Sequence, residues 1–222
     1  MSSPTVKKLK RHEVGGLPLI EAILSRMGLK EIFAEALAPS DRERISSVDV
    51  LLMLVRNLVV AKDPLYELAE WMDTLDLRPL GFAEQPSVRF TDDRFGRALD
   101  KLYAADRASL QTEVVLAVIR AFDIKLDRIH NDSTSVKACG KIPGQTRTGL
   151  ELRLGYSKDH RPDLKQLVFS LSISADGAVP IHHQVYPGNR NDDTTHIETW
   201  NYLRTLHGRA DFLYVADGKL CT

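Results

Sequence analysis

The hydrophobic pattern of the chain changes its period near residue 125, and this change constrains the fold more than any other feature. Before that point apolar residues recur every three or four positions, which is the spacing of one face of an α-helix. After it they alternate with polar residues or form short runs, which is typical of β-strands. The pattern therefore predicts an α+β protein, with a helical domain over residues 1–125 and a strand-containing domain over residues 126–222.

The first part of the chain predicts a helical bundle whose boundaries are marked by residues that start or stop helices. Gly28 separates two short helices, and Ser46 or Ser47 precedes a strongly apolar one. Asp63 and Pro64 have the residue types of an N-cap and a first helical position. The expected helices cover residues 17–27, 29–37, 46–61, 64–72, 91–102 and 109–122, with Thr91 as a further cap.

The second part predicts a strand, a long basic segment, a hairpin, a helix and a last strand. Asp176 and Gly177 are typical of a two-residue hairpin turn. Thr195 and Glu198 have the spacing of a capping box at a helix start. The expected elements cover residues 126–131, 167–174, 179–186, 195–206 and 212–216. Since residues 212–216 are continuously apolar, they predict a central strand covered on both faces.

Two aspartates, Asp132 and Asp217, directly follow expected strands. If those strands are adjacent and parallel, they lie about 4.8 Å apart, so that both carboxylates can share a hard cation such as Mg²⁺. Two such ions suit phosphoryl transfer on nucleic acid. The same residues also suit a strand-end cap beside Ser133 and a turn with Gly218, and spacing alone leaves both interpretations open.

Charge is unevenly distributed, although 30 basic and 30 acidic residues balance to a formal charge of zero. The first twelve residues carry a charge of +4, and residues 133–165 carry seven basic residues against three acids. These seven residues are Lys137, Lys141, Arg147, Arg153, Lys158, Arg161 and Lys165. Such a segment suits contacts with DNA phosphates, and it equally suits a solvated loop that keeps the chain soluble.

The remaining signals concern the compartment and the class of site. Cys139 and Cys221 form neither a CxxC pair nor a disulfide framework. No apolar run approaches the roughly 20 residues of a membrane span, and no apolar signal region follows the basic N-terminus, so we expect a cytoplasmic protein without membrane contact. His182 and His183 are adjacent on an expected strand, so their side chains point to opposite faces and do not suit one metal.

Four segments of the chain resemble DDE transposases of bacterial insertion sequences. They are residues 12–19 (HEVGGLPL), 130–135 (HNDSTS), 155–166 (GYSKDHRPDLKQ) and 215–218 (VADG). The resemblance extends over essentially the whole chain, and the segment 155–166 is its most specific part. It implies a helical N-terminal domain that binds the DNA ends of the element, followed by a ribonuclease H-like catalytic α/β domain with a mixed sheet.

The resemblance also implies residue roles. Asp132 matches the first catalytic acid, on the first strand, and Asp217 matches the second, on the fourth strand, with Mg²⁺ or Mn²⁺ as cofactor. The third acid of the family is a glutamate on a later helix with a Tyr, Arg, Glu and Lys signature. Nothing before Thr222 matches it, and Glu198 precedes the second aspartate. We therefore expect an incomplete catalytic domain that is inactive by itself.

The implied partners are the terminal inverted repeats of the element and its target DNA, and the family resemblance allows a homodimer. Two other functions stay open. One is an inactive DNA-binding or regulatory fragment, and the other is a phosphoesterase of another type on a ribonuclease H-like fold.

Overall fold

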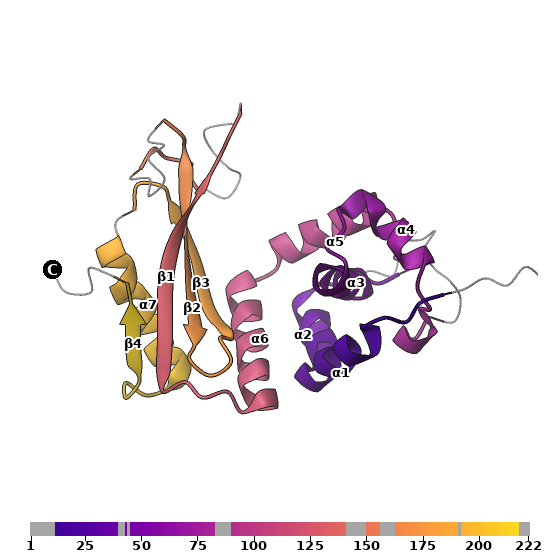
Figure 1. Cartoon of the computed structure of the whole chain (residues 1–222), viewed down its shortest axis with the longest axis horizontal. Helices are drawn as coiled ribbons and strands as arrows, with labels where there is room; N and C mark the ends of the chain where they lie inside the picture. The colour runs from indigo at the N-terminus through magenta and orange to yellow at the C-terminus, as the bar shows by residue number, and fades with distance from the viewer. Residues whose placement is uncertain are drawn as a thin grey trace, which may run out of the picture. The chain divides into compact units, whose positions relative to one another are not determined.

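The computed structural model describes residues 12–39, 43, 45–82, 90–140, 150–155, 163–190 and 192–217, the side chains of 192–194 excepted (Figure 1). The chain divides into two compact units, Met1–Ala117 and Val118–Thr222. The division falls inside helix α6 (Arg107–Phe122), some residues before the predicted boundary after residue 125. Helices come first and a mixed sheet follows, which confirms the α+β class. No helix in the described ranges is long and apolar enough to cross a membrane.

The first unit consists of helices that begin and end close to the predicted positions. Gly28 has a φ of 65°, a left-handed conformation that favours glycine, and it ends one helix and begins the next. Ser46 caps the apolar helix by accepting a hydrogen bond from the backbone N–H of Asp49. The helices are α1 (Leu17–Met27), α2 (Leu29–Ala36), α3 (Ser47–Val60), α4 (Leu68–Asp73) and α5 (Asp92–Ala104), with 3₁₀ turns η1 (Leu65–Glu67) and η2 (Arg78–Leu80).

Two predicted helix starts differ from the structure, and a third lacks its expected capping hydrogen bond. After Pro64 the chain forms the 3₁₀ turn η1 before α4, and Asp63 accepts a hydrogen bond from the Asn57 side chain at 3.1 Å instead of capping. Thr91 precedes α5, but its side chain makes no capping bond. Helix α6 begins before Ser109, because Asp106 supplies the carboxylate that accepts from Ser109.

The second unit contains a four-stranded sheet with strand order β3-β2-β1-β4 (Figure 1). Its strands are β1 (Arg128–Lys137), β2 (Gln166–Ser174), β3 (Pro180–Pro187) and β4 (Leu213–Ala216). The pairs β1–β2 and β2–β3 are antiparallel, whereas β1 and β4 are parallel. The two predicted acids therefore belong to neighbouring parallel strands: Asp132 lies on β1, and Asp217 directly follows β4.

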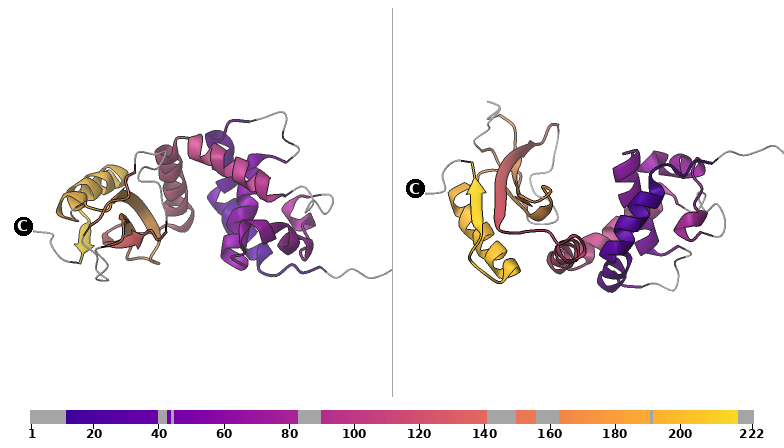
Figure 2. Two further views of the ribbon diagram at one scale, coloured as in Figure 1. Left: turned by 90° about the horizontal axis from the view of Figure 1, so that it is seen from above. Right: turned by 60° about the horizontal axis from the view of Figure 1, so that its bottom comes forward.

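Helix α7 (Asp192–His207) packs on one face of the sheet (Figure 2). His182 on β3 stacks on Tyr202 of α7 with ring centroids 3.9 Å apart. The hydroxyl of Tyr214 on β4 lies 3.0 Å from Nδ1 of His196 on α7. We call this side of the sheet the covered face and the other side the open face. On β2 the serines 170, 172 and 174 occupy the covered face and are buried, whereas Phe169, Leu171 and Ile173 occupy the open face and are half-buried.

Three predictions for this unit are wrong. The connection between β2 and β3 spans residues 175–179, not two residues, and the N–H of Ser174 donates to the carbonyl of Val179 across it. Helix α7 begins at Asp192, so Thr195 lies inside the helix and is not its cap. Strand β4 is an edge strand of the described sheet, where β1 is its one partner, and Leu213 on it is 56% exposed.

Candidate functional site

Asp132 and Asp217 occupy equivalent positions on neighbouring strands. The parallel register of β1 and β4 ends with Asn131 opposite Ala216, and the two aspartates are the next residues of each strand. Adjacent strands lie about 4.8 Å apart, and residues paired in this way point to the same face. Both side chains are exposed, and both line one pocket of about 610 Å³ on the open face.

The position of Asp132 within its strand differs from the prediction. Strand β1 does not end at Asn131 but continues to Lys137, so Asp132 lies inside a strand of ten residues and not in a turn. Its Oδ1 accepts a hydrogen bond from the N–H of Ser133 at 2.8 Å. Asp217 follows the end of β4, as predicted. The two acids therefore lie at the end of β4. Beyond them β1 stays paired with β2 but has no partner on its β4 side in the described sheet.

The pocket combines carboxylates with an apolar floor. Its lining residues come from β1, β2 and β4 and from the residue after β4. The open-face members are His130, Asp132, Thr134, Phe169, Leu171, Ile173, Val215 and Asp217. Such a surface offers two anionic oxygen ligands beside a half-buried apolar wall.

The chemistry of the two acids fits a hard divalent cation. Mg²⁺ takes oxygen ligands at about 2.0 to 2.1 Å and is commonly held by one or two carboxylates, with substrate phosphates and waters completing the shell. Among the described residues no group of three His, Cys, Asp or Glu side chains is placed to hold a metal. Asp132 and Asp217 would thus supply the protein ligands, and the remaining positions would face the solvent and a phosphate.

Glu198 does not join this pair. It lies on α7, which packs on the covered face, and its carboxylate forms an ion pair with Arg190. The side chains of Asp192 and Asp193, two further candidates for a third ligand, lie outside the described residues.

The histidines of β3 point to opposite faces, as predicted. His182 pairs with Ser172 and stacks on Tyr202, whereas His183 pairs with Leu171 and stacks on Phe169 at 5.9 Å. Burial, followed by the neighbouring His183, lowers the pKa of His182 to about 4. His182 is therefore neutral near pH 7 and serves the packing between sheet and helix.

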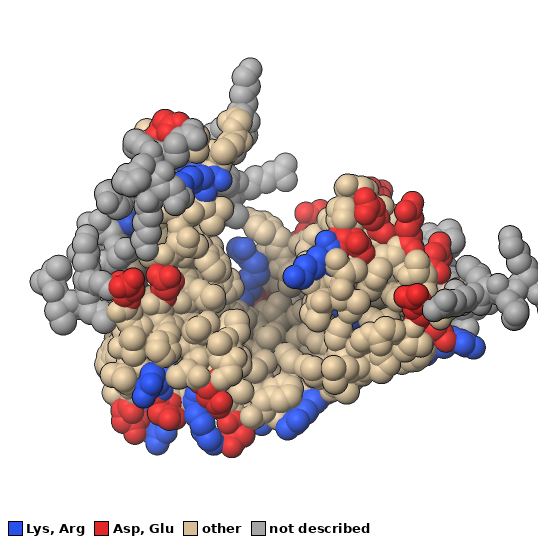
Figure 3. Space-filling view, viewed as in Figure 1, with Lys and Arg blue, Asp and Glu red and all other residues tan. Residues whose placement is uncertain are grey.

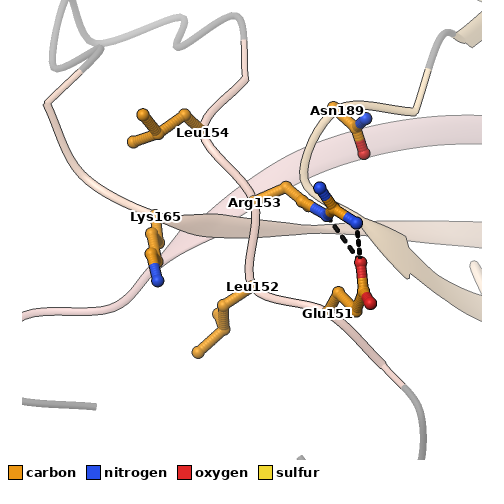
Figure 4. Close-up of a pocket in the computed structure, with 6 residues that line it drawn as sticks. All are labelled: Glu151, Leu152, Arg153, Leu154, Lys165 and Asn189. Atoms are coloured by element: carbon orange, nitrogen blue, oxygen red, sulfur yellow. Dashed lines mark hydrogen bonds and ion pairs between the residues drawn. The ribbon is translucent and has the colours of Figure 1, made fainter. Parts of the chain in front are cut away.

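Only three of the seven predicted basic residues lie in the described part of the chain. Lys141, Arg147, Lys158 and Arg161 lie outside it, and Lys137 is half-buried at the end of β1. Arg153 and Lys165 line a second pocket of about 430 Å³ with Asn189 (Figure 4). Nε of Arg153 donates to Glu151 at 2.6 Å, so this cation is paired within the pocket.

The second pocket depends on a close approach of two backbone segments. Arg153 and Gln166 exchange two backbone hydrogen bonds of 3.2 and 2.9 Å, which attach the segment 150–155 to β2. A Cβ added at Gly155 would lie 1.8 Å from the carbonyl oxygen of Gly188. Glycine at these two positions therefore allows the contact.

Described basic and acidic side chains are interspersed on the surface. In the view of Figure 3, red and blue side chains alternate along the lower edge of the second unit. The basic stripe expected from residues 133–165 thus rests mainly on residues outside the described ranges.

Sequence reasoning missed a buried polar cluster directly behind Asp132. Nδ2 of Asn131 donates to the hydroxyls of Ser170 and Ser172 at 3.0 and 2.9 Å, and the Ser170 hydroxyl lies 3.4 Å from Oδ1 of Asn131. All three residues are at most 5% exposed. The alternating serines of β2 were the available signal, but the pattern does not state which face they occupy.

Comparison with known proteins gives one match. Residues 9–116 match a family model described as a domain of unknown function, DUF4277. No curated protein and no solved structure matches the chain. The matched residues lie wholly within the first unit, so the chain is similar to this family in its helical part, and the match does not include Asp132 or Asp217.

Proposed function

We propose that the chain acts in DNA transposition, as part of a DDE-type transposase that cuts and joins DNA strands by metal-dependent phosphoryl transfer. One observation carries the proposal: Asp132 and Asp217 are the next residues after the last paired positions of two parallel strands, and they line one pocket. This is the arrangement that a shared divalent cation requires, and the motifs around both acids resemble the same family.

The two aspartates would hold Mg²⁺ or Mn²⁺ through one carboxylate each. A cation held there supplies Lewis-acid activation of the attacking hydroxyl and stabilises the leaving oxygen of a phosphodiester. Asp132 projects from β1 and Asp217 directly follows β4, so the sheet fixes the position of that charge. Their exposure suits a substrate that is itself a large polymer, since DNA can reach a carboxylate pair at the surface.

Phosphate contacts are assigned to Arg153 and Lys165 among the described residues. Both line the second pocket, and Lys165 is exposed. A phosphate can compete with Glu151 for Arg153, because a carboxylate and a phosphate accept the same bidentate hydrogen bonds. Lys158 and Arg161 lie between these two positions in the sequence and are proposed as further phosphate contacts.

A non-catalytic DNA-binding role is the second candidate. Two carboxylates suffice to hold a cation that bridges to a phosphate without reaction. A phosphoesterase of another type would act on small phosphate esters, so substrate size separates it from both DNA functions.

The decisive experiment measures Mn²⁺ binding and plasmid nicking by the purified chain. The plasmid carries the DNA that flanks the gene, and the variants are Asp132→Ala and Asp217→Ala. Asp127→Asn is the matched control, since Asp127 is exposed, does not line the pocket of Asp132 and Asp217, and bonds to β4 through its backbone carbonyl. We expect both site variants to lose Mn²⁺ binding and the control to keep it. Mn²⁺ binding that persists in both site variants would refute the metal site, and binding without nicking would favour the non-catalytic role.

A second experiment measures DNA affinity against salt concentration. Arg153→Ala and Lys165→Ala should each lower the slope of log affinity against log salt by up to about 0.9. The two substitutions are also combined. Equal slopes of log affinity against log salt in the parent and in this double variant would show that these two cations do not contact phosphate.

A further inference from the structure

The cluster of Asn131, Ser170 and Ser172 lies in a sheet whose hydrophobic pattern does not match its burial. On β2 the serines face α7, whereas Phe169, Leu171 and Ile173 face the open side and are half-buried. A slip of one residue between β1 and β2 would reverse the faces of β2. Because burying apolar area is favourable, hydrophobicity alone favours the reversed arrangement, with the apolar residues against α7.

The polar cluster favours the observed register over the reversed one. In the observed register Asn131 lies directly opposite Ser172 and diagonal to Ser170, and its amide bonds to both hydroxyls. In the reversed arrangement both serines would leave the covered face, and the amide of Asn131 would face apolar side chains. A buried amide without partners is strongly disfavoured, so the polar cluster selects the observed register.

The selected register also decides which residue of β2 lies beside Asp132. Successive residues of a strand point to opposite faces, so Asn131 on the covered face is followed by Asp132 on the open face, opposite Leu171 and next to Asp217. A slip of one residue would bring a serine into the place of Leu171.

We infer that Asn131 is a positioning residue: with Ser170 and Ser172 it locks the β1–β2 register that places Leu171, and not a serine, beside Asp132 in the pocket. The use of Asp132 as a metal ligand rests on the proposed function, whereas the register assignment does not.

The first test is a cysteine pair that reports the register without a metal. Val136 and Leu167 are directly paired, so Val136→Cys and Leu167→Cys should form a disulfide in the native register. Cys139 and Cys221 are replaced by serine throughout. Asn131→Val is compared with the triple variant Asn131→Val/Ser170→Ala/Ser172→Ala and with Ser174→Ala. Ser174 is the matched control, because its buried hydroxyl bonds to Asp176 and Val179 and not to Asn131.

We expect the control to form the disulfide as fast as the parent and both Asn131 variants to form it at least about tenfold more slowly. The triple variant separates register from stability, because removing all polar partners together leaves no buried group unpaired and should restore the melting temperature. A triple variant that regains stability but not cross-linking supports the lock. Cross-linking at the parent rate in either Asn131 variant would overturn it.

The second test is Mn²⁺ binding to the same variants without the cysteine pair. Changes in the shell of residues around a metal site commonly lower affinity by about 10- to 100-fold, so both Asn131 variants, with a serine in the place of Leu171, should bind Mn²⁺ at least about tenfold more weakly. Ser174→Ala should bind like the parent. If Asp132→Ala also binds like the parent, the proposed metal site fails, while the cross-linking result still decides the register lock.

Discussion

Replacement of Gly188 by alanine tests how the second pocket is built. A Cβ at this position would lie 2.2 Å from the carbonyl oxygen of Gln166 and 2.5 Å from that of Arg153. Both obstacles are backbone atoms, so a rotamer change cannot relieve the clash. The turn at Gly188 must therefore shift away from Gln166, and the segment 150–155, which contacts that turn, must shift with it.

The cost follows from the contacts that this movement breaks. Two backbone hydrogen bonds contribute about 1 kcal/mol each, and exposure of the Leu152 side chain, which is 9% exposed, costs about 2 kcal/mol. The expected loss in the free energy of unfolding is thus about 3 to 4 kcal/mol, and less if the segment detaches without unfolding the sheet. Displacing Arg153 should also weaken DNA binding and lower its salt slope by up to about 0.9.

Urea unfolding and the salt dependence of DNA affinity measure the two effects. Gly16→Ala is the control, because a Cβ there meets no atom within 4 Å. Gly188→Ala with parental stability would show that the close approach of the two segments does not exist in solution.

Two further predictions follow, one for each unit. Glu21→Ala should lower the stability of the first unit by about 2 to 3 kcal/mol, because it leaves the Arg56 guanidinium, with 5% of its side chain exposed, without its carboxylate. Lys30→Ala, which breaks a more exposed pair with Asp49, should cost less than about 1 kcal/mol in the same urea titration, and equal losses would contradict this reasoning. Burial lowers the pKa of His182 to about 4, against 6.5 for the free side chain. As the pH falls, the histidine is therefore protonated in the unfolded state before it is protonated in the folded state. Stability should fall as the pH drops from 6.5 to 4, and His182→Phe should remove part of that fall; identical pH profiles would refute the assignment.

The helices were largely predictable because their signals are local. Gly28 and Ser46 act on the residues next to them, and the structure agrees at both positions. The capping box at Thr195 failed because the helix begins earlier, at Asp192, and includes Thr195 on its buried side. Local signals thus identify a helix more securely than its first residue.

The sheet was less predictable because strand patterns do not contain strand order. The apolar run before Asp217 suggested a central strand, yet β4 is an edge strand of the described sheet. The alternation on β2 predicted a strand without stating that the serines lie inside. Of the candidate site, the adjacency of Asp132 and Asp217 was predictable from strands that precede acids, whereas the cluster behind Asp132 depends on the pairing between β1 and β2.

The serines between sheet and helix also set a limit for protein engineering. Ser172 and Ser174 are fully buried, so the space around these small side chains is already filled. The usual route to thermostability replaces buried polar residues by larger apolar ones. Here each added methylene would have to displace the atoms packed around the serine, and overpacking of this kind typically costs about 1 to 3 kcal/mol. A more stable form of this protein should therefore be sought on its open face, where Phe169, Leu171 and Ile173 still have apolar surface to bury.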